Sequence, residues 1–156
     1  MQSDFIIRRA ETHDAASLAA VLVSVGWFAR INAMTAEAAA EHARRFLEQC
    51  ISGDSHSVWV AELTDGLLAG YVAVHWLPYL ILSGPEGFVS ELFVRPDVAG
   101  QGIGGKLLET VITEARARGC SRLSLIIAAA AIGLELGIIS SAVNSAVILI
   151  AVITCT

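Results

Sequence analysis

The chain has 156 residues, enough for one domain with a sizeable core, and 55% of them are hydrophobic. Its formal net charge is −5, its pI is about 5.3 and it contains no basic cluster, which argues against a nucleic-acid partner. The mean hydropathy of +0.66 is high for a soluble domain, and the excess lies at the C-terminal end.

The first residues do not combine a basic stretch with an apolar run, so we expect no secretory signal and a cytoplasmic location. Cys50, Cys120 and Cys155 are odd in number and far apart, which favours buried thiols in a reducing compartment. No Cys or His spacing is typical of a metal site, so we expect no bound metal.

Hydrophobic spacing predicts a strand and two helices in the first third of the chain. Residues 5–9 are expected to form the strand, and Asp14 to cap a helix that ends near Gly26. Thr35 is the expected N-cap of a second helix that runs to about Ile51.

Two further strands are predicted over residues 58–63 and 67–76. The Asp65-Gly66 pair between them is a strong hairpin signal, so these strands should pair antiparallel. Residues 78–87 should then form a loop.

A strand, a glycine-rich loop and a helix follow, and the rest of the chain is organised around them. Residues 89–94 are rich in β-branched and aromatic side chains and are stopped by Pro96. Apolar residues recur at helical spacing from Leu107, and the helix should end at Gly119. Four glycines precede this helix, at a place where free N–H groups and the helix dipole favour a phosphate: Gly100, Gly102, Gly104 and Gly105.

Two common phosphate-binding patterns match the sequence of residues 100–107 only in part. Residues 100–105 satisfy G-x-G-x-x-G, but the next apolar run, 123–127, does not end in the acidic residue that a dinucleotide site needs. Residues 100–106 satisfy most of the P-loop pattern, but Leu107 stands where a magnesium-binding hydroxyl is required.

A third pattern fits better. Val94-Arg95-Pro96-Asp97, followed by Gly102-Ile103-Gly104 and Leu107-Leu108, resembles the acyl-CoA loop of the GNAT N-acetyltransferase superfamily. The resemblance covers about residues 5–127. It implies a mixed α/β (α+β) domain whose twisted, mostly antiparallel sheet is flanked by helices.

The resemblance also implies acetyl-CoA as cosubstrate, with its pyrophosphate on the backbone of the loop and its pantetheine arm along the preceding strand. Ala99 departs from the family, which usually has Arg or Gln at that position. The expected cofactor-binding residues are Leu92, Phe93, Val94, Ala99, Gly100, Gln101, Gly102, Ile103, Gly104, Gly105 and Lys106.

Glu91 is the candidate general base. In residues 88–94, Val89, Glu91 and Phe93 alternate with apolar neighbours, so its carboxylate should stand in apolar surroundings that favour accepting a proton. The resemblance implies such a base, often acting through a water. The structural alternative is a Glu91 paired with Arg8 or Arg95. His75 is a second candidate base, because histidine titrates in the useful range.

The acceptor should be a primary amine of a small molecule or a protein. The resemblance implies that Trp27 and Phe28 help to form the acceptor pocket. Trp76 and Tyr79, near the end of a predicted strand, are expected on another wall because loops often carry binding residues; the alternative for all four is a structural role. The family's usual general acid, a tyrosine on a later helix, has no counterpart, since no tyrosine follows Tyr79. The backbone N–H of Phe93 or Val94 is the expected polariser of the thioester.

The tail over residues 123–156 is abnormally apolar. Three interpretations are open: a membrane anchor, an apolar terminus that pairs with a partner chain through a buried strand over 146–153, or letters that differ from the natural ones, for instance through a frameshift. We expect no membrane partner and leave a homodimer open. As a whole, the chain is predicted to be an acetyl-CoA-dependent N-acetyltransferase, with a non-catalytic CoA-binding module of the same fold as the alternative.

Overall fold

The computed structural model describes residues 4–127 and 149–154. In chain order the strands are β1 (Phe5–Arg9), β2 (His56–Leu63), β3 (Leu68–Leu77), β4 (Glu86–Val94), β5 (Arg122–Ile127) and β6 (Leu149–Thr154). The helices are α1 (Ala15–Val25), α2 (Ala29–Asn32), α3 (Ala36–Ile51) and α4 (Ile103–Ala117), with short 3₁₀ helices at Thr12–Asp14 and Pro96–Val98. The strands and helices predicted from the sequence between residues 5 and 127 are present, but β4 begins at Glu86, inside the segment predicted as a loop, and α4 begins at Ile103, before its predicted start.

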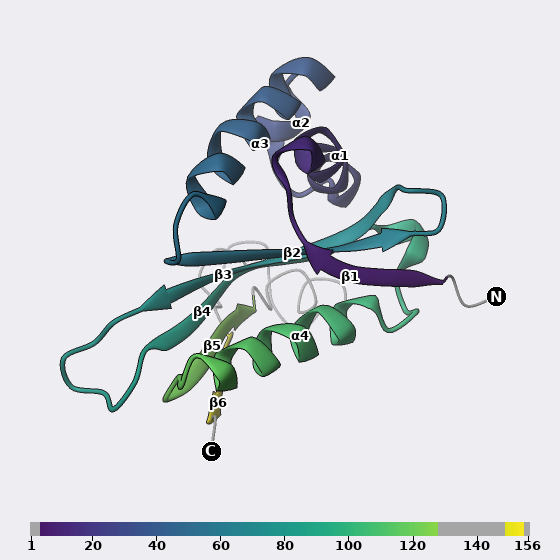
Figure 1. Ribbon diagram of the computed structural model, residues 1–156. Helices are drawn as coiled ribbons and strands as arrows, with labels where there is room; N and C mark the ends of the chain where they lie inside the picture. Colours follow the sequence, from purple (N-terminus) through teal and green to yellow (C-terminus); the bar gives the residue numbers. More distant parts are fainter. Residues whose placement is uncertain (1–3, 128–148, 155–156) are drawn as a thin grey trace, which may run out of the picture.

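The strands form one sheet in sequence order, and every neighbouring pair is antiparallel except β4 and β5, which are parallel. Helix α4 covers one face of this sheet, and α1, α2 and α3 cover the other (Figure 1). This is the expected mixed, mostly antiparallel sheet flanked by helices.

Each face of the sheet has its own apolar core. Under α4, four side chains spaced four residues apart on one stripe of the helix are almost fully buried: Ile103, Leu107, Val111 and Ala115. Burying each of the three larger ones contributes about 1.5–3 kcal/mol. Under α1 and α3, Leu18, Val21 and Leu47 pack against Val60 and Tyr71 of the sheet.

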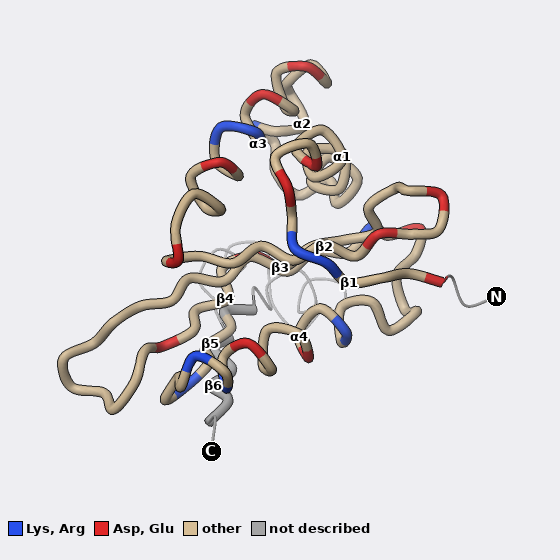
Figure 2. Tube along the Cα trace, viewed as in Figure 1, with Lys and Arg blue, Asp and Glu red and all other residues tan. Residues whose placement is uncertain are grey.

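The β1–α1 junction is held by an ion pair of Asp14 rather than by the helix cap expected from the sequence. Asp14 is the N-cap residue of α1, but its side chain makes no capping hydrogen bond to that helix. Its buried carboxylate instead accepts from Arg8 at 2.7 and 2.8 Å and from the N–H of Glu11 at 2.8 Å. Burial by itself raises the pKa of Asp14, yet these donors outweigh it and lower the pKa. The basic end of β1 lies beside α1 in Figure 2.

A β-bulge in β4 changes which residues share a face. Ala73 pairs with Glu91 but Val74 pairs with Val89, so Ser90 is the extra residue. Val89 consequently packs in the core under α4, whereas Glu91 faces the helices α1 and α3. The alternation expected over residues 88–94, with Val89 and Glu91 on one face, is therefore broken at Ser90. Glu91 is an exposed residue rather than, as the sequence had predicted, one enclosed by apolar neighbours.

The apolar tail contributes an edge strand. Residues 149–154 form β6 and pair with β5 of the same chain, from Arg122–Thr154 to Ile127–Leu149. The start of the strand expected over 146–153 lies outside the described residues. Within residues 4–127 and 149–154, no helix is both long enough and apolar enough to cross a bilayer.

Candidate active site

The glycine loop turns the chain from β4 into α4. Gly100 and Gly102 have φ angles of 78° and 82°, in the left-handed region that favours glycine. Gly102 is the N-cap of α4, and no side chain caps the helix there. Its carbonyl accepts the first hydrogen bond of the helix, from the N–H of Lys106 at 3.0 Å. The N–H groups that precede Lys106 in the first turn therefore have no acceptor within the helix. A helix start of this kind is suited to an anion.

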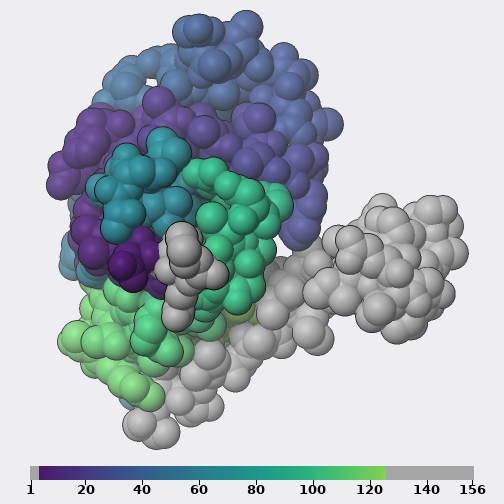
Figure 3. All heavy atoms as spheres, turned by 90° about the vertical axis from the view of Figure 1, so that its right-hand side faces the viewer, coloured from purple at the N-terminus to yellow at the C-terminus, as the bar shows by residue number. Residues whose placement is uncertain are grey.

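Both ends of the loop are fixed. Arg95 donates its backbone N–H to Ala69 at 2.8 Å, and its guanidinium pairs with Asp97 at 2.6 Å. Val98 and Ile103 are buried, while Ala99 and Gly100 are exposed. Figure 3 shows the green segment that carries this loop at the molecular surface, beside the teal β2–β3 hairpin.

The other expected cofactor residues lie on both sides of the sheet and on the helix. Leu92 and Val94 pack toward the core under α4, and Phe93 toward that under α1 and α3. The Lys106 side chain is exposed and pairs with Glu109 at 2.8 Å. Gln101 and Gly104 are half-buried, and Gly105 is exposed.

The second half of β4 has an edge that β5 does not cover. The parallel pairing of these strands runs from Glu86–Arg122 to Val89–Leu125 and, among the described residues, does not continue past the bulge at Ser90. Residues 91–94 pair with β3 along their other edge and, among residues 4–127 and 149–154, with no second strand. Such an edge can bind an extended ligand through main-chain hydrogen bonds.

A groove of about 270 Å³ lies between the helices α1 and α3 and the sheet. The sheet wall consists of Val58, Tyr71, Ala73, His75, Ser90 and Glu91. The helical wall is mainly apolar and includes Leu18, Leu22, Ala43, Phe46, Leu47 and Cys50. Both candidate bases, Glu91 and His75, therefore line one groove.

Tyr71 holds the Glu91 carboxylate. Its hydroxyl donates to Glu91 Oε2 at 2.6 Å, and only 4% of the tyrosine is exposed. Burial, together with the adjacent carboxylate, raises the pKa of Tyr71, so its O–H remains a donor. The structural alternative for Glu91 named other partners, but Arg8 pairs with Asp14 and Glu62, and Arg95 pairs with Asp97.

His75 is linked to the bulge and to a second histidine. Its Nε2 is 3.0 Å from Ser90 Oγ, and its ring centroid is 4.3 Å from that of His56. Partial burial lowers the pKa of His75, and His56 lowers it further. The neutral imidazole is thereby favoured.

The four expected acceptor residues fall into two groups. Trp27 and Phe28 both meet Phe93 edge-on, with centroid distances of 6.3 and 5.3 Å, and Tyr71 also contacts that ring. They are thus connected to the groove through Tyr71 but do not line it.

Trp76 and Tyr79 lie elsewhere. Trp76 lies within β3, buried in the core under α4, and donates to Ser57 Oγ at 2.9 Å. Tyr79 follows β3 and lies beside the guanidinium of Arg122. Neither residue is among those that line the groove.

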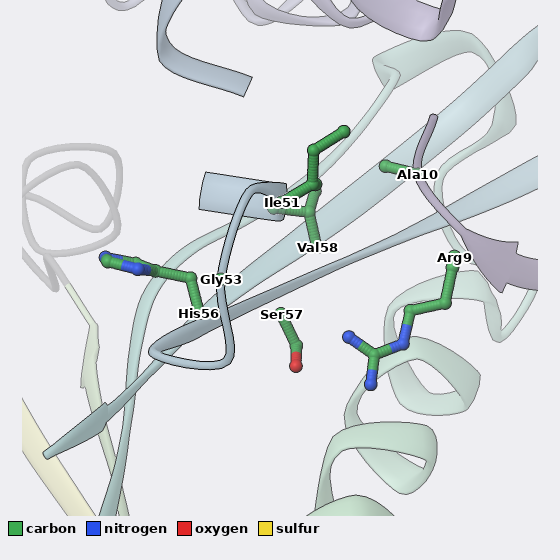
Figure 4. A pocket seen from close by; sticks show the side chains of 7 residues that line it. All are labelled: Arg9, Ala10, Ile51, Gly53, His56, Ser57 and Val58. Carbon is green, nitrogen blue, oxygen red and sulfur yellow. The ribbon is translucent and has the colours of Figure 1, made fainter. Parts of the chain in front are cut away.

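A second hollow, of about 230 Å³, lies where α3 turns into β2. Figure 4 shows the side chains of Arg9 and Ser57 directed toward α4, with Ile51 and Val58 on the other side of the strand. Arg9 and Ser57 are both bound to Glu114 of α4. This hollow therefore belongs to a structural network.

Sequence reasoning missed Tyr71, Ser90, His42 and Cys50 as groove residues. Tyr71 and Ser90 depend on strand register and on the bulge, which no local pattern reveals. The helical periodicity of α3 could have placed His42 with Ala43, Phe46 and Cys50 on one side of that helix. In the part of the chain that the structure describes, no group of three or more metal-ligating side chains gathers.

Comparison with known proteins identifies the family. The model of the Acetyltransferase (GNAT) family matches residues 27–134. An uncharacterized N-acetyltransferase of Archaeoglobus fulgidus is 36% identical over 76 residues, which cover 48% of this chain and 51% of that protein. The thialysine N-epsilon-acetyltransferase of Bos taurus is 33% identical over 58 residues, or 37% of this chain and 34% of that enzyme. The matches thus span about half of the archaeal protein and a third of the bovine one.

The fold has solved relatives. The crystal structure of a GNAT-family acetyltransferase from Streptococcus pneumoniae has a TM-score of 0.62 and 27% identity, with 86% of this chain and 83% of that one covered. The glycine loop and the family match agree, and the chain belongs to the GNAT acetyltransferase family.

Proposed function

We propose that the chain is an acetyl-CoA-dependent N-acetyltransferase that acts on a primary amine of a small molecule or a protein. One observation carries the proposal: β4 presents Glu91 to the groove and leads directly into the glycine loop at the start of α4. A base and an anion site are therefore on one continuous segment, at the point where β5 leaves the strand edge uncovered.

The loop would hold the diphosphate of acetyl-CoA. The N–H groups of the first turn of α4 point out of the helix end, and the glycines let a phosphate approach the backbone closely. Backbone contacts do not need the side chain that Ala99 lacks. The uncovered edge of residues 90–94 would take the pantetheine arm.

Acetyl-CoA supplies the acetyl group as a thioester, whose carbonyl carbon the amine nitrogen attacks. Glu91 accepts the proton that the ammonium must lose, directly or through one water. The N–H of Val94 polarises the thioester oxygen while charge develops on it, because the alternation of the β3–β4 ladder directs the Phe93 N–H to β3 and that of Val94 to the open edge. The C–N bond then forms and the C–S bond breaks.

The CoA thiolate leaves and takes up the second proton that the amine nitrogen loses as it becomes an amide, directly or through water. A free thiol has a pKa of about 8.5, so the thiolate is a fair leaving group near neutral pH. The absence of a tyrosine after Tyr79 in the sequence is compatible with this chemistry.

A thiol-release assay tests the proposal. The chain is mixed with acetyl-CoA and a panel of primary amines, and free CoA thiol and acetylated amine are both measured. Release in step with amine acetylation is expected. Binding of acetyl-CoA without release for any amine would instead support a non-catalytic CoA-binding module.

A further inference from the structure

The groove beside Glu91 has the chemistry of a selective amine pocket. Its helical wall presents aliphatic and aromatic carbon from Leu18, Leu22, Ala43 and Phe46. Phe46 is 47% exposed although it lies on the side of α3 that faces the groove. An apolar group in the groove would cover it.

The charges in the groove are unbalanced. Among the described residues that line it, Glu91 is the one carboxylate and no Lys or Arg is present. The remaining titratable groups are two imidazoles, His42 and His75, a thiol, Cys50, and the Tyr71 hydroxyl. Burial raises the pKa of Cys50 and the Glu91 charge raises it further, so the thiol stays neutral. A second anion in this groove would have no Lys or Arg side chain to pair with.

The size of the groove limits the occupant. A cavity of about 150 Å³ holds benzene. The groove, at about 270 Å³, has room for a six-membered ring with a short arm. Because Tyr71 occupies Glu91 Oε2, the other carboxylate oxygen, Oε1, is left to meet the amine or its bridging water.

We propose that this groove selects a primary amine with a single positive charge on an apolar body, and rejects amines that carry a carboxylate or phosphate beside the nitrogen. The inference rests on the proposed function and names its acceptor class. The ammonium lies at Glu91 and gives up its proton there, while the apolar body lies along Leu22, Ala43 and Phe46.

Two probes that differ by one carboxylate test the selection. 2-Phenylethylamine and phenylalanine have the same ring, arm and amine, and kcat/KM for each is measured by thiol release with acetyl-CoA. We expect phenylethylamine to be favoured by at least about tenfold, because the carboxylate would lie unpaired beside Glu91. Equal values, or a preference for phenylalanine, overturn the proposal.

A binding measurement distinguishes a failure of this proposal from a failure of the proposed function. Both probes are titrated calorimetrically into the chain, with CoA present and absent. If phenylethylamine binds at least about tenfold tighter but no thiol is released, the acceptor groove stands and the transferase function fails. If the two bind equally, or neither binds, the groove proposal fails even where other amines are acetylated.

A groove-filling variant locates the apolar body. Ala43→Phe should lower kcat/KM for phenylethylamine by at least about tenfold and leave that for ethylamine within about threefold. Ala38→Phe, an exposed position on the same helix, is the matched control and should change neither. Equal losses for both amines in Ala43→Phe, with thermal unfolding unchanged, contradict the placement.

Discussion

At the residue scale, the site is centred on one carboxylate and the hydroxyl that holds it. Glu91 could be selected from the sequence because an acid interrupts an apolar strand just before the glycine loop. Tyr71 could not, because twenty positions separate the two residues and only the β3–β4 register brings them together. The bulge at Ser90 then turns Glu91 toward the groove. It shifts the alternation of the strand by one residue, but both faces of β4 carry apolar side chains, so the shift cannot be recognised in the sequence.

Glu91→Gln should lower kcat by about 100-fold or more, because the amide cannot accept the proton of the ammonium. The affinity for acetyl-CoA should stay within about twofold, since the loop is untouched. Initial rates and calorimetric binding measure the two quantities. Glu41→Gln, an exposed acid on α3, is the control. An unchanged kcat would remove Glu91 from the mechanism.

Tyr71→Phe should lower kcat by about tenfold while the KM for acetyl-CoA stays the same. The variant keeps the buried ring but releases Glu91 Oε2, so the carboxylate is less well oriented for the amine. Phe28→Leu, which trims the neighbouring aromatic contact with Phe93, is the comparison for a purely structural loss. A rise in KM for acetyl-CoA with kcat unchanged would argue against a positioning role for Tyr71.

At the element scale, most helices and strands could be predicted from the sequence, and the exceptions have physical causes. The four-residue helix α2 was not predicted, because one turn is too short to show a periodic face. Helix α4 begins at Ile103, four residues before the predicted start, since Gly104 and Gly105 are poor helix formers yet lie in its first turn. The aromatic pair at Trp27 and Phe28 was expected near the acceptor, but the sequence could not show that Phe93 lies between them and the groove wall.

Gly102, the N-cap of α4, has a matched control in Gly66, which lies between β2 and β3. Gly102 and Gly66 both have φ of 82°, and a Cβ added at either would meet open space. Replacement by Ala should therefore cost each a similar amount of stability, about 1 kcal/mol, through backbone strain. Only Gly102→Ala should also weaken acetyl-CoA binding, by about tenfold, because it disturbs the N–H groups of the first turn.

Chemical denaturation and calorimetry on the two variants measure these effects. If Gly66→Ala, in the β2–β3 hairpin, weakens binding as much as Gly102→Ala does, the loss reflects general destabilisation rather than the anion site.

At the scale of the whole molecule, one partly buried carboxylate, that of Glu114, connects α4 to the sheet. Glu114 accepts from Ser57 Oγ and Trp59 Nε1, both at 2.8 Å, and from the guanidinium groups of Arg9 and Arg118. Burial by itself raises the pKa of Glu114, but these donors together lower it. The polar bonds connect helix and strands that lie more than fifty positions apart in the chain, and no sequence pattern pointed to them.

Glu114→Gln should lower the free energy of unfolding at pH 7 by about 2–4 kcal/mol, because charge-assisted bonds are lost and two arginines lose a partner. A lowered folded-state pKa means that this contribution is present above the unfolded-state pKa, about 4.3, and is lost as pH falls through the folded value. The difference between the two proteins should therefore shrink below pH 4. Denaturation at several pH values measures it.

Glu109→Gln is the control on the same helix. Glu109 forms an exposed pair with Lys106, so its loss should change stability by less than about 1 kcal/mol. A pH-independent difference between Glu114→Gln and the parent chain would show that the carboxylate charge is not what stabilises the network.

The central claim is that main-chain N–H groups at the start of α4 bind the diphosphate of acetyl-CoA. Calorimetric titration with acetyl-CoA and with S-acetylpantetheine, which lacks the nucleotide and its diphosphate, tests it most directly. We expect acetyl-CoA to bind at one site per chain and at least about 100-fold tighter than acetylpantetheine, given that each charge-assisted hydrogen bond contributes about 1.5–3 kcal/mol. Equal affinities for the two, or no binding of acetyl-CoA, would contradict it.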